Sequence, residues 1–145
     1  MHDVVIVGAG PAGSALATRL SAAGADVVVL DQAHFPRDKV CGDFVNARAL
    51  AQLQALGCYD DIVALGCTPI TRSSTWLGDR CLARTDLPHI AGMPAHGFTI
   101  PRKQLDAAIL ARAQRAGAGV VEGARAIELA YERDHVTVVA EHEGS

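Results

Sequence analysis

The sequence lacks the features that mark membrane, secreted and nucleic-acid-binding proteins. None of its apolar runs reaches the roughly 18 residues of a transmembrane helix. The first residues, Met1 to Asp3, carry no excess of the positive charge that opens a signal peptide. The net charge is −3 and no block of like charge occurs, which gives no support to nucleic-acid binding or to a polybasic membrane patch. We therefore expect a soluble, cytoplasmic protein without a nucleic-acid partner.

Cysteine is sparse as well. The four cysteines are irregularly spaced and none belongs to a CxxC pair, so we predict neither a metal site nor a disulfide framework. We interpret Cys58, Cys67 and Cys81 as small buried thiols. Half of the residues are hydrophobic, and a chain of this length and composition can build the core of one domain.

A strand, a helix and a second strand are predicted at the start of the chain. Residues 4–7 are β-branched, as expected for a parallel strand that is covered on both faces. Residues 11–23 predict a helix rich in small residues, which begins at Pro11 and ends before Gly24. Residues 27–30 form the second strand. These elements make a βαβ unit, whose crossover should be right-handed.

The rest of the sequence predicts a polar connection over residues 32–45, three helices and several strands. A connection of this length in a compact domain usually has a function. The helices are predicted at residues 47–56, with Asn46 as N-cap, at 59–65 and at 102–116. The remaining predictions are one or two antiparallel strands within 68–84, a loop over 85–96, strands at 97–100 and 120–121, and a hairpin of 126–131 with 135–140.

Three glycines follow the first strand in the stretch VVIVGAGPAG, residues 4–13. A parallel strand that feeds directly into a helix directs the helix N-terminus to the carboxyl edge of the sheet, where free N–H groups attract an anion. Gly8 would allow the sharp turn, Gly10 the approach of a pyrophosphate, and Gly13 the close packing of helix on strand. The predicted phosphate donors are the amides near Pro11, Ala12 and Gly13.

An acidic residue completes this fingerprint. Asp31 follows Gly13 by 18 residues and ends the second strand, where a carboxylate can bind the ribose hydroxyls of an adenosine. Its charge would repel a 2′-phosphate, so we do not expect NADP at this site. Because FAD and NAD both contain ADP, the fingerprint alone does not distinguish between them.

Beyond the fingerprint, the chain resembles FAD-dependent oxidoreductases of the glutathione-reductase type. The resemblance extends over VVIVGAGPAGSALATRLSAAGADVVVLD (4–31), FPRDKVCGD (35–43) and GFTIPRKQLDAAILARAQRAGAGV (97–120). The second segment is similar to a loop of geranylgeranyl reductase-like flavoproteins, in the branch that contains the aromatic hydroxylases. The implied fold is α/β: a Rossmann-like parallel βαβ FAD-binding domain with an antiparallel β insertion and a C-terminal β-hairpin.

The resemblance implies roles for individual residues toward FAD. The glycines Gly8, Gly10 and Gly13 would line the pyrophosphate, and Asp31 would bind the ribose, where the family more often has Glu. Backbone groups of Ala126, which follows the predicted strand at 120–121, would meet the adenine. The other implied contacts are Arg37 at the phosphate or ribityl chain, Cys41 and Gly42 near the flavin ring, and Arg102 on the far side of the loop.

Some of these residues have a second interpretation. Two arginines suit a doubly negative diphosphate, but either could be an ordinary surface residue, with Asp38 or Asp43 as an ion-pair partner of Arg37. Cys41 could touch the flavin or the substrate as a catalytic residue, because neighbouring cations favour the thiolate, or it could simply pack. We expect structural or exposed positions for His34, His89 and His96, and a place in the core or the substrate wall for Trp76.

The implied activity is that of a geranylgeranyl reductase-like enzyme. Reduced FAD would deliver a hydride to a carbon–carbon double bond of a prenyl or other lipophilic substrate, with NAD(P)H as electron donor. An alternative is an FAD-dependent monooxygenase that hydroxylates an aromatic or polyketide-like substrate. A third is an inactive nucleotide-binding fragment.

The family's members are much longer than this sequence. They continue into a Gly-Asp motif at the ribityl chain and a substrate-covering sheet. We therefore expect residues 1–145 to be the N-terminal portion of an incomplete FAD-binding domain, without the substrate domain. A lipophilic substrate would also allow peripheral association of the whole enzyme with a membrane.

Overall fold

The structure, a computed structural model, describes residues 1–40 and 43–143. The chain divides into two compact units. The first consists of Met1–Lys39 and Lys103–Ser145, and the second of Val40–Arg102. Within the described residues, no helix is long and apolar enough to cross a membrane.

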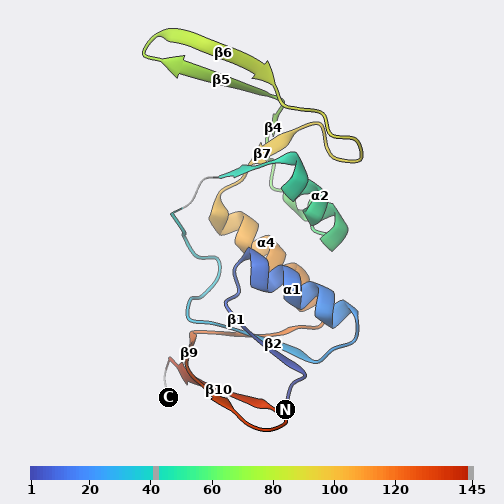
Figure 1. Cartoon of the computed structure of the whole chain (residues 1–145), viewed down its shortest axis with the longest axis vertical. Coiled ribbons are helices and arrows are strands. Elements are labelled where there is room, and N and C mark those ends of the chain that lie inside the picture. The colour runs from blue at the N-terminus through green and yellow to red at the C-terminus, as the bar shows by residue number, and fades with distance from the viewer. Residues whose placement is uncertain (41–42, 144–145) are drawn as a thin grey trace. The chain divides into compact units, whose positions relative to one another are not determined.

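A parallel sheet of three strands forms the centre of the first unit (Figure 1). β2 (Val27–Asp31) lies between β1 (Val4–Val7) and β8 (Gly119–Glu122) and pairs with both in parallel. The helix α1 (Pro11–Ala22) connects β1 to β2, which confirms the predicted βαβ unit. The start of α1 follows from Pro11 at its first position, because proline needs no hydrogen-bond partner for its nitrogen there.

Helices cover one face of this sheet. Ile6 pairs with Val29 across the strands, so both side chains point to the same face, and both are buried. The buried cluster on this face includes residues of α1 and of α4 (Arg102–Arg115). The cluster consists of Ile6, Ala9, Ala17, Val27, Val29, Leu110, Ala113 and Ala118.

The prediction that the first strand is covered on both faces is wrong. Val7 is 58% exposed, although Ile6 beside it is buried. The two neighbours point to opposite faces of the sheet, and Ile6 belongs to the cluster that contains residues of α1 and α4. A β-branched run therefore indicates a strand here, but it does not indicate how many faces are buried.

A hairpin follows β8 in the first unit. β9 (Ala124–Tyr131) pairs antiparallel with β10 (Val136–His142), with an irregular register between Val139 and Ala140. The predicted hairpin is confirmed and is longer than expected. Ala126, predicted as the first residue of the hairpin, lies inside β9.

The second unit combines two helices with a small antiparallel sheet. Its helices are α2 (Ala47–Leu56) and α3 (Tyr59–Val63). The Asn46 side chain accepts a hydrogen bond from the Ala49 N–H at 2.9 Å, which confirms the predicted cap. The sheet has the order β3 (Phe44–Val45), β7 (Gly97–Thr99) and β4 (Pro69–Ile70). β3 thus occupies the last two residues of the polar connection predicted over residues 32–45.

A second hairpin, β5 (Arg72–Leu77) with β6 (Arg80–Asp86), also belongs to the second unit. All of its strand residues are exposed, including Trp76 at 54%. The predictions of a core position for Trp76 and of a buried Cys81 are wrong, because both lie in this exposed two-stranded ribbon. The alternative place of Trp76 in the substrate wall stays a prediction. Cys58 is buried as predicted, and Cys67 is half-buried.

Candidate functional site

The glycine-rich turn after β1 has a tightly specified backbone. Gly8 has a φ of +103°, a region that favours glycine, and its N–H donates to the Leu30 carbonyl at 2.7 Å. A Cβ on Gly13 would lie 1.9 Å from the Gly8 carbonyl oxygen, so only glycine fits there. A Cβ on Gly10 would meet only the Arg37 Nη2 atom, at 3.7 Å. The turn is therefore closed beneath Gly13 and open above Gly10.

The N-terminus of α1 presents backbone amides at this opening. Gly10 is the N-cap, and it supplies no side-chain hydrogen bond to the first turn. The first turn also contains no acidic residue. The positive end of the helix dipole is therefore not balanced by a side chain of α1, an arrangement that favours an external anion.

One buried hydroxyl of α1 bonds to the turn, and a second bonds within the helix. The Ser14 hydroxyl donates to the Ala9 carbonyl at 2.8 Å, and the Thr18 hydroxyl donates to the Ser14 carbonyl at 2.8 Å. Neither residue was predicted as part of the site from the sequence. Their spacing of four residues on a helix of small side chains is the signal that could have found them.

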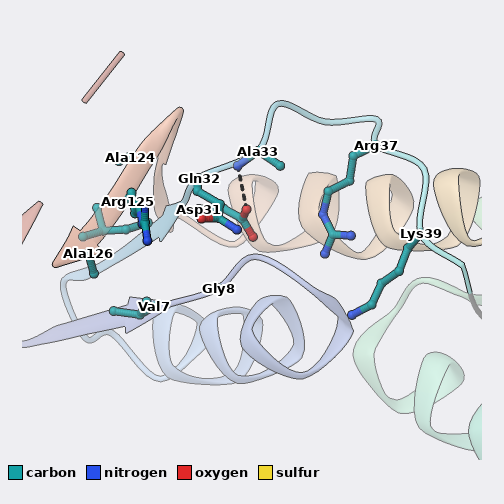
Figure 2. A pocket seen from close by; sticks show the side chains of 11 residues that line it. Val7, Gly8, Asp31, Gln32, Ala33, Arg37, Lys39, Ala124, Arg125 and Ala126 are labelled. Atoms are coloured by element: carbon teal, nitrogen blue, oxygen red, sulfur yellow. Dashed lines mark hydrogen bonds between the residues drawn. The ribbon is translucent and has the colours of Figure 1, made fainter. Parts of the chain in front are cut away.

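Asp31 connects the turn after β1 to the turn after β2. Its Oδ2 accepts from the Ala9 N–H at 2.7 Å and its Oδ1 accepts from the Ala33 N–H at 2.9 Å. Figure 2 shows the second of these bonds at the edge of the pocket. Each carboxylate oxygen has a further lone pair, so these bonds are compatible with the predicted contact to a ribose hydroxyl.

A cavity of about 480 Å³ opens beside these two turns (Figure 2). Its lining carries three cations, Arg37, Lys39 and Arg125, against the single carboxylate of Asp31. This balance suits a ligand with a doubly negative diphosphate. The other lining residues are Val7, Gly8, Leu30, Gln32, Ala33, Ala124 and Ala126.

Arg37 has a different partner from those considered in the sequence analysis. Its Nη2 lies 3.9 Å from Oδ2 of Asp106, a fully buried residue on α4. Its guanidinium carbon also lies 5.0 Å from the centre of the Phe35 ring, within cation–π range. Asp38 instead pairs with Lys103 at 3.7 Å. Arg37 and Asp106 lie far apart in the sequence, and for this reason residue order alone did not predict their ion pair.

His34 joins the connection after β2 to two other elements. Its Nε2 lies 2.9 Å from Glu143 and its Nδ1 lies 3.6 Å from Glu122. The hydrogen bond to Glu143 and the negative charges of both carboxylates raise the pKa of His34. Glu122 also accepts from the Phe35 N–H at 3.1 Å. Sequence reasoning found no partner for His34, because Glu143 is far along the chain.

The structure brings together only some of the predicted site residues. Gly8, Asp31, Arg37 and Ala126 line one cavity. Gly10 caps α1, whose first turn contains Pro11, Ala12 and Gly13. Cys41 and Gly42 lie outside the described residues. Arg102 belongs to the second unit, so its contact with the cofactor remains a prediction. Within the described residues, no group of three or more His, Cys, Asp or Glu side chains could hold a metal ion.

These features define a class of protein. A parallel βαβ unit, a glycine turn that opens a helix and a carboxylate at the end of the second strand are the features of a dinucleotide-binding domain. The full chain, residues 1–145, matches the FAD binding domain family and belongs to it. The open space above Gly10 and the cationic lining of the cavity fit the diphosphate of FAD.

Relatives of this chain carry out different reactions. It is 42% identical over 129 residues to menaquinone reductase of Mycobacterium tuberculosis, a match that covers 86% of this chain and 30% of the relative. It is 30% identical to rifampicin monooxygenase of Rhodococcus hoagii, over 94% of this chain and 28% of the relative. Digeranylgeranylglycerophospholipid reductase 2 of Methanosphaera stadtmanae is 27% identical over 98% of this chain and 35% of the relative. The chain thus spans about a third of the length of these relatives.

A solved structure confirms the fold class. The crystal structure of a flavoprotein/dehydrogenase from Cytophaga hutchinsonii superimposes with a TM-score of 0.88 at 22% identity. The match covers 98% of this chain and 35% of that chain. The predicted α/β fold of FAD-binding flavoproteins is therefore confirmed, whereas the narrower geranylgeranyl reductase-like assignment rests on one distant relative.

Proposed function

We propose that this chain forms the ADP-binding part of a flavin-dependent oxidoreductase that reduces a carbon–carbon double bond of a lipophilic substrate. The observation that carries the FAD assignment is the glycine turn, closed under Gly13 and open at Gly10, beside a cavity with three cationic side chains. In this proposal the amides of the first turn of α1 and Arg37 bind the diphosphate, Asp31 binds the ribose, and Ala126 borders the adenine.

Bound FAD would supply hydride chemistry, which no protein side chain provides. The chain's own residues bind and orient the cofactor. The bonds from Ala9 and Ala33 to Asp31 fix the carboxylate before the ribose arrives, so little side-chain freedom is lost on binding. We also propose that Arg102 helps to hold FAD from the far side of the loop, and that Cys41 and Gly42 approach the flavin ring.

Two kinds of relative support the proposed substrate class. The menaquinone reductases share more identity with this chain than the other relatives described above. The match to the digeranylgeranylglycerophospholipid reductase covers nearly the whole of this chain. Both names describe the reduction of a lipophilic molecule. We propose that the whole enzyme reduces a prenyl or similar lipophilic substrate and that NAD(P)H is its electron donor. We also propose that it is cytoplasmic and associates with a membrane only through its substrate.

FAD binding is tested by flavin release. The purified chain is denatured, and the released flavin is identified by chromatography and quantified against protein. The proposal expects FAD close to one per chain, or saturable FAD binding by a chain purified without it. A chain that neither carries flavin nor binds FAD or ADP in titration would contradict the proposal.

The reaction is tested on the longest polypeptide that contains this chain. The FAD-loaded protein is reduced without oxygen and incubated with menaquinone or a geranylgeranyl lipid, and products are analysed by mass spectrometry. Reduction adds two hydrogens to the substrate while the flavin returns to its oxidised form. Flavin that stays reduced with both substrates would contradict the proposed reaction.

A monooxygenase is the second candidate, and the match to rifampicin monooxygenase over 94% of this chain favours it. It differs from a reductase in its use of oxygen. A monooxygenase would consume O₂ with NAD(P)H and add one oxygen atom to an aromatic substrate, whereas the proposed reductase adds hydrogen only.

A further inference from the structure

The position of Arg37 over the glycine turn calls for a physical explanation. Its Nη2 lies 3.7 Å from the place where a Cβ on Gly10 would be, so the guanidinium stands beside the opening at the N-terminus of α1. Arginine has many side-chain rotamers, and holding it in one place costs conformational entropy. Other groups of the first unit must therefore fix it there.

Two side chains fix the guanidinium without occupying its hydrogen-bond donors. The Phe35 ring lies 5.0 Å from the guanidinium carbon, and Asp106 lies 3.9 Å from Nη2. The second distance allows an ion pair but is too long for a hydrogen bond. Among the described residues, no hydrogen bond uses the Arg37 fork, so its donors can face a phosphate.

Asp106 is suited to this task because it is fully buried on α4, whereas Arg37 is 21% exposed. A buried carboxylate attracts a cation more strongly than an exposed one, because water screens it less. It also has few alternative positions. Its charge therefore acts as a fixed anchor on the rigid helix, while Arg37 comes from an irregular segment.

The geometry points to Asp106 as a positioning residue: its buried carboxylate holds the Arg37 fork beside Gly10, where the donors of the fork can contact a diphosphate bound at the N-terminus of α1. This inference rests on the proposed function, since it concerns how the FAD diphosphate is recognised. Asp106 acts through Arg37 and does not touch the ligand.

The chain offers a matched control. Asp38 and Lys103 form a second ion pair between the same connection and α4, at 3.7 Å, but the Asp38 side chain is 88% exposed. Asp38→Asn makes the same chemical change as Asp106→Asn at a screened, exposed pair. Comparing the two variants therefore isolates the effect of the buried carboxylate.

The first measurement needs no ligand. The folded chains are treated with phenylglyoxal, and the rate of Arg37 modification is followed by mass spectrometry. Asp106→Asn should raise this rate several-fold because the side chain is released, and Asp38→Asn should leave it unchanged. An unchanged rate in Asp106→Asn would overturn the inference.

The second measurement is a double-mutant cycle on binding of FAD, ADP and adenosine. Arg37→Met should weaken FAD and ADP binding about tenfold or more, as expected for a lost charge-assisted phosphate contact. Asp106→Asn should weaken both several-fold, but not adenosine, and should have no further effect in the Arg37→Met background. Equal losses in both backgrounds, or an equal loss for adenosine, would show a merely structural role and contradict the inference.

Two outcomes need separate treatment. If circular dichroism shows that Asp106→Asn does not fold, Asp106→Glu replaces it, since it keeps the charge and should retain slow Arg37 modification and most of the ADP affinity. A folded Asp106→Glu with fast modification would overturn the inference. If the wild-type chain binds neither FAD nor ADP, the proposed function fails, and the phenylglyoxal experiment still decides whether Asp106 holds Arg37.

Discussion

The two segments that border the cavity are held in different ways. The turn after β1 is fixed by short contacts of its own backbone: Gly8 bonds to Leu30, Ala9 bonds to Asp31, and Ser14 bonds back to Ala9. The connection after β2 is held by side chains that reach distant elements. Its contacts are those of His34 with Glu122 and Glu143, of Arg37 with Asp106, and of Asp38 with Lys103.

This difference has an energetic consequence. Short buried hydrogen bonds are costly to break because each leaves a polar group without a partner. Exposed ion pairs, such as those of His34 with Glu143 and of Asp38 with Lys103, contribute little, since water and salt screen them. The pair of Arg37 with the buried Asp106 is screened less. The glycine turn should therefore keep its shape with or without ligand, whereas the connection should respond to pH and to single charge changes.

The largest effect on stability is expected from Gly13→Ala, which changes the glycine turn itself. The new Cβ would lie 1.9 Å from the Gly8 carbonyl oxygen and 3.2 Å from Cγ2 of Ile6, so strand and helix must separate. We expect a loss of about 3 kcal/mol or more in the free energy of unfolding, as for overpacked cores. FAD binding should be lost with it, and urea unfolding and FAD titration measure both.

Gly78→Ala is the control for this substitution. Gly78, unlike Gly13, has a positive φ, of +54°, but a Cβ there would meet no atom within 4 Å. Gly78→Ala should lower the free energy of unfolding by about 1 kcal/mol, the usual cost of a side chain in the left-handed region. Equal destabilisation by the two variants would show that the close approach at Gly13 is not what requires glycine.

A smaller effect is expected from Asp31→Asn, which keeps the shape of the side chain. An amide can accept from only one of the two N–H groups of Ala9 and Ala33 with its single oxygen. The other N–H loses its partner, which should cost about 1–3 kcal/mol in the free energy of unfolding.

Asp26→Asn serves as the comparison for that variant. The Asp26 carboxylate lies 3.0 Å from His2, and its side chain is 61% exposed, so the change should cost less than about 0.5 kcal/mol. Denaturant unfolding of both variants is the measurement. A cost at Asp31 as small as the cost at Asp26 would show that the turn does not depend on the carboxylate.

The smallest effect is expected from His34→Gln, and it should depend on pH. The raised pKa of His34 means that the extra stabilisation from its charged contacts with Glu143 and Glu122 is fully present below the unfolded value of 6.5. This stabilisation is lost as pH rises through the higher folded value. Hydrogen exchange of the Phe35 amide should be slower in the wild type than in the variant at pH 6, and the difference should disappear above the folded pKa. A difference that is the same at pH 6 and pH 9 would contradict this account.

The same contrast explains what could be predicted from the sequence. The βαβ unit, the Asn46 cap and the β9–β10 hairpin were predicted because their signals lie within a few neighbouring residues. The pairing of β3 with β7, the ion pair of Arg37 with Asp106 and the two partners of His34 were not, since each joins residues far apart in the chain. Exposure failed in a similar way: Trp76 and Cys81 are apolar, but the ribbon that carries them leaves both exposed.

The different burial of Cys58 and Cys81 allows thiol labelling to report the opening of helices in the second unit. Cys58 stands at 0% exposure directly before α3, whereas Cys81 is open to solvent. A thiol reagent added to the folded chain would label Cys81 at once and Cys58 only when α2 and α3 open. The difference between the labelling rates of Cys81 and Cys58, measured by mass spectrometry, gives the rate of that opening without an engineered probe.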